Sequence, residues 1–143
     1  MPQHSFNVSD PIAVRDTLLA AALELRSSRG DSGCVHPIPS EGQLFVSGDL
    51  HDNPFHFTKL VQLADLENPA NHLLLQEIIH ATDATLELDL SHRMLIRAAA
   101  LLLEFKGQVH PILANHELSQ MTNRRITKNG VELVQRFDDG VEH

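Results

Sequence analysis

The chain has 143 residues, 42% of them hydrophobic, with 19 acidic residues against 11 Lys and Arg and a formal net charge of −8 at pH 7. This is the length of one domain with enough apolar residues to bury a sizeable core, so disorder is not expected. An acidic chain with six Phe and no Tyr or Trp lacks both the basic surface and the stacking platform that nucleic-acid binding requires.

The first half of the chain predicts two helices separated by a loop and a strand. An Asp-Pro pair starts a helix at Asp10, and apolar residues at helical spacing continue it to a stop at Gly30. Residues 31–42 are rich in Gly, Pro and Ser and predict a loop. The apolar run QLFVSG over residues 43–48 predicts a buried strand, and an Asn-Pro pair starts a second helix over residues 53–68.

The second half predicts two more strands on either side of a third helix. Residues 72–79 (HLLLQEII) are too continuously apolar for a half-exposed strand and suit a central position in a parallel sheet. The third helix is capped by Asp89 or Ser91, carries an apolar stripe for the core and ends at Gly107. Residues 108–113 (QVHPIL) predict a strand whose proline places it at an edge or a strand end.

The last part of the chain is predicted to add a short helix and a strand. The helix follows Asn115, a loop covers residues 123–130 (NRRITKNG), and a strand covers residues 131–137, with no closing element in the polar end FDDGVEH. The alternation of strands and helices after an N-terminal helix implies an α/β fold with a parallel sheet in βαβαβ order. We divide the chain into a helix and loop over residues 1–42 and an α/β domain over residues 43–143.

All three predicted strands end in residues that can bind a metal ion. The first ends in GDLHD, with Asp49 and His51, the second in QEIIH, with Glu77, and the third in ANHE, with Asn115 and His116. Ligands of parallel sheets sit beyond the carboxyl ends of strands that lie about 5 Å apart, so these side chains can converge. Carboxylate, imidazole and amide groups suit Mn, Fe or Zn.

These strand ends resemble the motifs of the calcineurin-like metallophosphoesterase family, over roughly Gln43 to Met121. The family carries Asp-x-His, Gly-Asp-x-x-Asp and Gly-Asn-His-Asp/Glu motifs in this order. Here the first is intact as GDLHD, the third is ANHE with Ala114 in place of glycine, and LLLQEIIH replaces LLLGDxxD. The resemblance implies that residues 43–143 form the parallel-sheet half of a metallophosphoesterase-type α/β sandwich.

The resemblance also implies a site for two divalent metal ions. Asp49 and His51 would hold the first ion, Glu77 would bridge the two, and Asn115 would be a ligand of the other. His116 would act as general acid toward the leaving-group oxygen. Two such ions activate a hydroxide that hydrolyses a phosphoester, in a small molecule or a phosphoprotein.

The chain departs from the family at several positions. His80 stands where the family has the second Asp of the middle motif; it is expected to hydrogen-bond to His116 as a second catalytic residue, without supplying a fixed negative charge. The arginines with which the family's protein phosphatases clamp phosphate are replaced by Ala81 and Leu113. The arginines at positions 124–125 either substitute for them or belong to a solvated loop.

The remaining candidate residues are expected to have structural roles. Asp52 and Glu117 are expected to orient or cap rather than to bind metal, and Cys34 to be an inert loop thiol. The other histidines are expected to be surface or structural residues: His4, His36, His56, His72, His92 and His110. The N-terminus lacks the pattern of a secretory signal and the longest apolar stretch is too short to span a bilayer, so we expect a cytoplasmic protein without a membrane partner.

Alternatives to a complete phosphoesterase site stay open. The family takes further histidine ligands from a second half that has no counterpart after Glu117, which implies the N-terminal portion of a longer enzyme or a half-site. A second interpretation is a catalytically degenerate domain that binds metal or another protein. A third is a small α/β domain whose strand ends bind an unrelated ligand, with Asp49 and Asn115 serving only as turn or helix caps.

Overall fold

The computed structural model of the chain describes residues 8–29, 35–81, 83, 85–128 and 130–143. The expected helix stop at Gly30, and Cys34 and His4, lie outside these residues. The described part contains these elements in order: α1 (Pro11–Arg29), β1 (Leu44–Asp49), α2 (Pro54–Ala64), β2 (His72–Gln76), α3 (His92–Glu104), β3 (Val109–Pro111), α4 (Asn115–Thr122), β4 (Thr127–Lys128), β5 (Val131–Glu132) and α5 (Leu133–Glu142).

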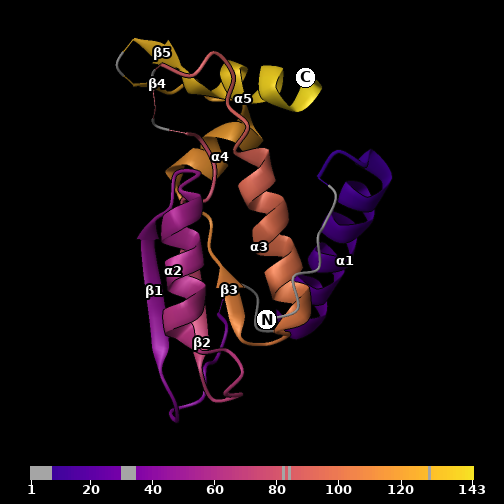
Figure 1. The fold of residues 1–143 in the computed structure, drawn as a ribbon, viewed down its shortest axis with the longest axis vertical. Helices are drawn as coiled ribbons and strands as arrows, with labels where there is room; N and C mark the ends of the chain where they lie inside the picture. Colours follow the sequence, from indigo (N-terminus) through magenta and orange to yellow (C-terminus); the bar gives the residue numbers. More distant parts are fainter. Residues whose placement is uncertain (1–7, 30–34, 82, 84, 129) are drawn as a thin grey trace.

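A three-stranded parallel sheet in the order β1-β2-β3 lies at one side of the molecule (Figure 1), and its edge strand β1, predicted to be buried, exposes Leu44 and Val46. Leu73 of β2 pairs with Phe45 of β1 and with Val109 of β3, so β2 is the central strand as expected. Pro111 ends β3 at the edge, where the missing amide hydrogen costs no ladder bond. The α/β class and the parallel order are therefore confirmed. The second strand is shorter than predicted, because Glu77 leaves the extended conformation with a φ of 44°.

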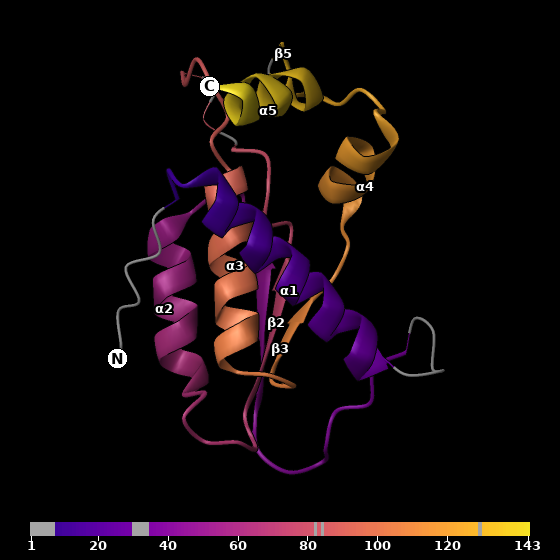
Figure 2. The same ribbon diagram turned by 90° about the vertical axis from the view of Figure 1, so that its right-hand side faces the viewer.

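One face of the sheet is covered by α2 and α3, which lie side by side, and α1 packs against α3 (Figure 2). The apolar stripe of α3 enters the core as predicted. The largest fully buried apolar side chains are Leu50, Leu73, Leu75, Met94 and Ile96. Within the described residues, no helix combines the length and the hydropathy that crossing a bilayer requires.

Side-chain caps start the first two helices where the sequence predicts them. Asp10 accepts hydrogen bonds from the amides of Ile12 and Ala13, at 3.0 and 3.3 Å. Asn53 accepts one from the amide of His56 at 2.9 Å, with proline at the first position of α2. Ser91 precedes α3, but its hydroxyl makes no cap bond to that helix.

The predicted strand over residues 131–137 is wrong beyond its first two residues. Val131–Glu132 form β5, which pairs with β4 in a short antiparallel hairpin within the expected loop. From Leu133 to Glu142 the chain forms α5, so the end of the chain does carry a closing element. The side chain of Glu132 accepts hydrogen bonds from two amides of the first turn, and the buried residues Leu133 and Phe137 are one helical turn apart.

The C-terminal elements lie beyond the carboxyl ends of the strands. In both views α4 and α5 stand above the sheet, and α5 contacts α3 (Figures 1 and 2). Gly140 allows the closest approach of α5 to the rest of the fold. A Cβ atom added there would lie 1.9 Å from the carbonyl oxygen of Asp89. The segment before α3 and the end of α5 are therefore packed backbone against backbone.

We predict that Gly140→Ala separates α5 from the segment at Asp89 and lowers the free energy of unfolding by about 2–3 kcal/mol, because the added methyl group overlaps main-chain atoms. The matched control is Asp139→Ala in the same helical turn. Because Asp139 is exposed, this variant should change the free energy of unfolding by less than about 0.5 kcal/mol. Urea denaturation of the three proteins measures both values. Equal stability of the two variants would show that this contact is not required.

Candidate metal centre

The site is built on two loops that leave the sheet through left-handed backbone conformations. His51 and Asp52 after β1, and Glu77 and His80 after β2, have φ values of 45°, 54°, 44° and 64°. Each such conformation costs a non-glycine residue about 1–2 kcal/mol, so surrounding contacts must hold it in place. The two loops hold each other, because the amide of His51 donates to the carbonyl of Glu77 at 2.7 Å and that of Asp52 to Ile78 at 3.2 Å.

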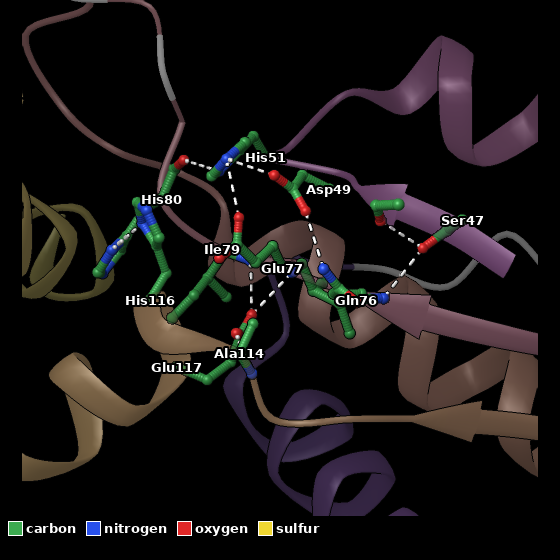
Figure 3. A network of polar contacts seen from close by, with 12 residues as sticks. Ser47, Asp49, His51, Gln76, Glu77, Ile79, His80, Ala114, His116 and Glu117 are labelled. Carbon is green, nitrogen blue, oxygen red and sulfur yellow. Dashed lines mark hydrogen bonds and ion pairs between the residues drawn. The ribbon is translucent and has the colours of Figure 1, made fainter.

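Three side chains from different elements converge beyond the strand ends (Figure 3). One ligand atom each of His51, Glu77 and His116 lies within 4.8 Å of the others, and this group can hold a metal ion. Nε2 of His51 is 3.2 Å from Oε2 of Glu77. Glu77 and His116 are buried and His51 is half-buried, so the ligand atoms face one another inside the fold. The predicted convergence of β1, β2 and the residues after β3 is confirmed for these three residues.

The contact between the His51 ring and the backbone carbonyl of His80 determines which ring nitrogen of His51 carries no hydrogen and can bind an ion. Its Nδ1 lies 3.2 Å from the carbonyl oxygen of His80, which can only accept a hydrogen bond. Nδ1 therefore carries the hydrogen, and in the neutral ring Nε2 carries the lone pair that faces Glu77. A lone pair and a carboxylate oxygen at 3.2 Å require a proton or a cation between them. A backbone carbonyl behind the ring is the usual support of a metal-ligating histidine.

The electrostatics of Glu77 and His116 favour a cation in the cluster. Burial raises the pKa of Glu77 and the negative charge of Asp49 raises it further, against a smaller opposing effect of His51, so a cation would stabilise the ionised carboxylate. Burial lowers the pKa of His116 to about 4, with the neighbouring His51 and His80 rings adding to the effect. At neutral pH the His116 ring is uncharged and offers a lone pair. The general-acid role that the resemblance implies needs the protonated ring and stays a prediction.

The other expected ligands lie at the edge of the cluster. The side chain of Asp49 is 52% exposed, and its Oδ2 is 4.0 Å from Nε2 of His51. Its Oδ1 accepts a hydrogen bond from the Gln76 side chain at 3.0 Å. Asn115 is the first residue of α4 and is exposed beside His116. Asp49 as a ligand of the first ion and Asn115 as a ligand of the other stay predictions, because the three converging side chains define a position for one ion.

His80 makes the contact that its place in the middle motif predicts. The residue is fully buried, and its Nδ1 lies 3.0 Å from Nδ1 of His116. Its amide donates to the hydroxyl of Ser91 at 2.9 Å, which explains why that hydroxyl does not cap α3. On its far side, Nε2 of His80 lies 2.9 Å from Oε1 of Gln120. Sequence reasoning missed Gln120, although its position four residues after His116 places both on one face of a helix.

Glu117 caps and does not point into the cluster, as expected. Its Oε1 accepts hydrogen bonds from the amides of Ile78 and Ile79 at 2.7 and 3.2 Å, and its Oε2 accepts one from Ala114 at 3.2 Å. The residue is buried, so these bonds are made away from water. This one carboxylate joins the loop after β2, which carries Glu77, to the start of α4, which carries His116.

Two arginines line a hollow that reaches the loop after β1, but they are not the two at positions 124–125. Those are exposed beyond the end of α4. Arg93 and Arg97 of α3 line a hollow of about 260 Å³ together with Asp52. A second hollow of about 320 Å³ contains His51 and also borders on Asp52. The two hollows share three lining residues, Asp52, Pro54 and Leu86, so the site and the arginines adjoin one surface.

Comparison with known proteins gives this site no relative. No family model, curated protein or solved structure matches the chain. The resemblance to the calcineurin-like metallophosphoesterases therefore depends on the residues at the strand ends and on where the fold places them.

A separate histidine cluster lies on the sheet away from the site. Nδ1 of His72 is 3.0 Å from Nε2 of His110, and the His36 ring packs on His110 with centroids 4.7 Å apart. His72 is buried, so these are structural histidines, one of the two roles expected. Burial, with the neighbouring His36 and His72 rings, lowers the pKa of His110 to about 4.

We predict that Glu117→Ala lowers the free energy of unfolding by about 3 kcal/mol or more, because three amides lose their acceptor. The exposed Glu67 provides the control, since Glu67→Ala should change it by less than about 0.5 kcal/mol. Urea denaturation measures both. A loss below 1 kcal/mol for Glu117→Ala, on the order of an ordinary single hydrogen bond, would contradict the proposed joining role.

We predict that His110 makes the fold less stable as the pH is lowered. Its pKa is depressed in the fold, so the unfolded chain binds a proton that the folded chain does not take up until the pH falls to about 4. The contribution of His110 to the free energy of unfolding is fully present above its ordinary pKa of 6.5 and is lost as the pH falls from 6.5 toward 4. Urea denaturation of the wild type and His110→Gln at pH 7 and pH 5 should show a smaller loss in the variant. Equal losses of stability in the wild type and the variant would contradict this role of His110.

Proposed function

We propose that this chain is a metal-dependent phosphoesterase domain of the calcineurin-like type. One observation carries the proposal: His51, Glu77 and His116, from three successive strand ends, bring ligand atoms within 4.8 Å of one another. The resemblance expects His51 and Glu77 as metal ligands and His116 as the general acid, so the cluster replaces the expected acid by a third ligand.

The residues present fit a divalent ion of the Mn, Fe or Zn class. Two imidazoles and one carboxylate form a mixed nitrogen and oxygen donor set, which suits these ions. The ion would supply Lewis-acid activation of a water molecule and of a phosphoryl oxygen. Glu77 would offset its charge, and the His80 carbonyl would hold the His51 ring in place. Asp49, half-exposed at the edge, would face the entering substrate or a second ion.

The surroundings of the cluster favour an anionic substrate. The chain carries a net charge of −8, yet Arg93 and Arg97 lie one helical turn apart beside the hollow that adjoins His51. A guanidinium group matches phosphate oxygens in geometry and charge. Phe55, which is 88% exposed, borders the hollow that contains His51 and would contact an apolar group on the ester. A phosphoester bound at the metal would therefore have arginines near its phosphate and Phe55 near its apolar group.

A specific contact favours the second candidate, a domain that binds metal without catalysis. The Gln76 side chain donates to Asp49 Oδ1, so this carboxylate is already engaged where the family has only a glycine beside the bridging residue. His80 likewise replaces a carboxylate by a buried neutral ring. Both features reduce the negative charge available to a second ion. Binding and hydrolysis therefore have to be measured separately.

We predict that the purified chain binds Mn²⁺ or Zn²⁺ and hydrolyses p-nitrophenyl phosphate only while the ion is bound. Isothermal titration calorimetry should show His51→Ala and Glu77→Gln weakening binding by about 100-fold or more, because each removes a donor atom. Hydrolysis should stop on chelation and in both variants. His143→Ala is the control, since this exposed histidine lies at the end of α5 and should leave binding and rate unchanged.

The outcomes separate the two candidates. Two ions bound per chain with hydrolysis would support the full site that the resemblance implies. One ion without hydrolysis would favour the binding domain and contradict the phosphoesterase. No binding, or hydrolysis that survives chelation, would contradict the metal centre itself.

A further inference from the structure

A line of polar side chains continues from His116 away from the metal cluster and ends at a carboxylate. His116 Nδ1 lies 3.0 Å from Nδ1 of His80, and His80 Nε2 lies 2.9 Å from Oε1 of Gln120. The Gln120 amide group then donates to Oδ1 of Asp138 at 2.7 Å. The four residues come from α4, α5 and the loop after β2, and none but His116 and His80 belongs to the strand-end motifs.

The carboxylate sets the direction of every hydrogen bond in this line. An ionised carboxylate only accepts, so the group of Gln120 that faces Asp138 is its NH₂, and its oxygen faces His80. That oxygen also only accepts, so Nε2 of His80 carries a hydrogen. In a neutral His80 ring, Nδ1 is then an acceptor, and Nδ1 of His116 must be the donor. The lone pair of neutral His116 is left on Nε2.

The two histidines of the line are buried, so the direction of its hydrogen bonds determines which ring nitrogens carry hydrogen. His80 is 0% exposed and His116 is 6% exposed, and the His80 ring packs against Phe137 with centroids 5.7 Å apart. Water has no access to His80 to replace a wrongly directed bond. The tautomer of His116 therefore depends on a residue 22 positions later in the chain, on another helix.

We propose that Asp138 is a positioning residue of the candidate metal centre, acting through Gln120 and His80. It holds His116 in the tautomer whose Nε2 is unprotonated and available as a ligand. This inference rests on the proposed metal site for its function, but the tautomer itself is a property of the metal-free chain. It assigns to α5 a part in the site, although α5 contributes no ligand.

The test compares two adjacent aspartates with the same change of charge. Asp138→Asn replaces the obligate acceptor by an amide that can also donate, so the Gln120 side chain can turn and reverse the line. Asp139→Asn is the matched control, because Asp139 is exposed and its side chain accepts a hydrogen bond from Gln135 of its own helix, away from the line. Long-range ¹H–¹⁵N correlation spectra of the metal-free proteins at pH 7 report which nitrogen of each histidine carries the hydrogen.

The wild type and Asp139→Asn should show His116 protonated at Nδ1, and Asp138→Asn a mixture with the Nε2-protonated form. Calorimetry with Zn²⁺ should show binding weakened by about 10-fold or more in Asp138→Asn alone, in the range found when a partner of a metal ligand is removed. The double variant Gln120→Glu with Asp138→Asn supplies a carboxylate acceptor directly to His80 and should restore the Nδ1-protonated form.

A wild-type His116 protonated at Nε2, or an unchanged tautomer in Asp138→Asn, would overturn the proposal. A changed tautomer with unchanged Zn²⁺ binding would overturn the positioning role. Because the spectra are recorded without metal, they decide the direction of the line even if the chain proves to bind no ion or to hydrolyse no phosphoester.

Discussion

The structure depends on how the backbone amides find hydrogen-bond acceptors where β2 leaves the sheet. The amides of Ile78 and Ile79 no longer have a neighbouring strand as acceptor, and in a buried position they require another one. The Glu117 carboxylate meets this need and accepts from Ala114 as well. As a result, the loop that carries Glu77 and the helix that carries His116 are fixed against each other.

The parts of the fold that follow from local chemistry could be predicted from the sequence. The Asp-Pro and Asn-Pro helix starts, the central apolar strand and the proline at the sheet edge all have local causes. The end of β2 could not be predicted from the sequence, because the left-handed conformation at Glu77 is stabilised by contacts with residues distant in the sequence. The helix α5 was mistaken for a strand because VELVQRF satisfies both periods: Leu133 and Phe137 fit alternation as well as a helical turn.

The candidate site was predictable to the extent that parallel strands bring their ends together. That rule alone places His51, Glu77 and His116 in one region, and the structure confirms it. It says nothing about residues that reach the region from another direction. Gln120 follows His116 by four residues on α4, so a helical spacing could have indicated it, but Asp138 belongs to the site only because α5 folds back above the strands, and no spacing in the sequence encodes that placement.

The origin of the ligands has a consequence for the motions of the molecule. His51 and Glu77 lie on the loops that follow β1 and β2, whereas His116 belongs to the C-terminal segment that stands above the sheet (Figure 1). Partial opening, in which this segment lifts while the sheet stays folded, would dismantle the centre before global unfolding. An ion that binds only the closed form would in turn suppress that opening by mass action. Amide hydrogen exchange in α4 and α5 would then slow when an ion occupies the proposed centre, because the ion would join the loops of the sheet to the C-terminal segment.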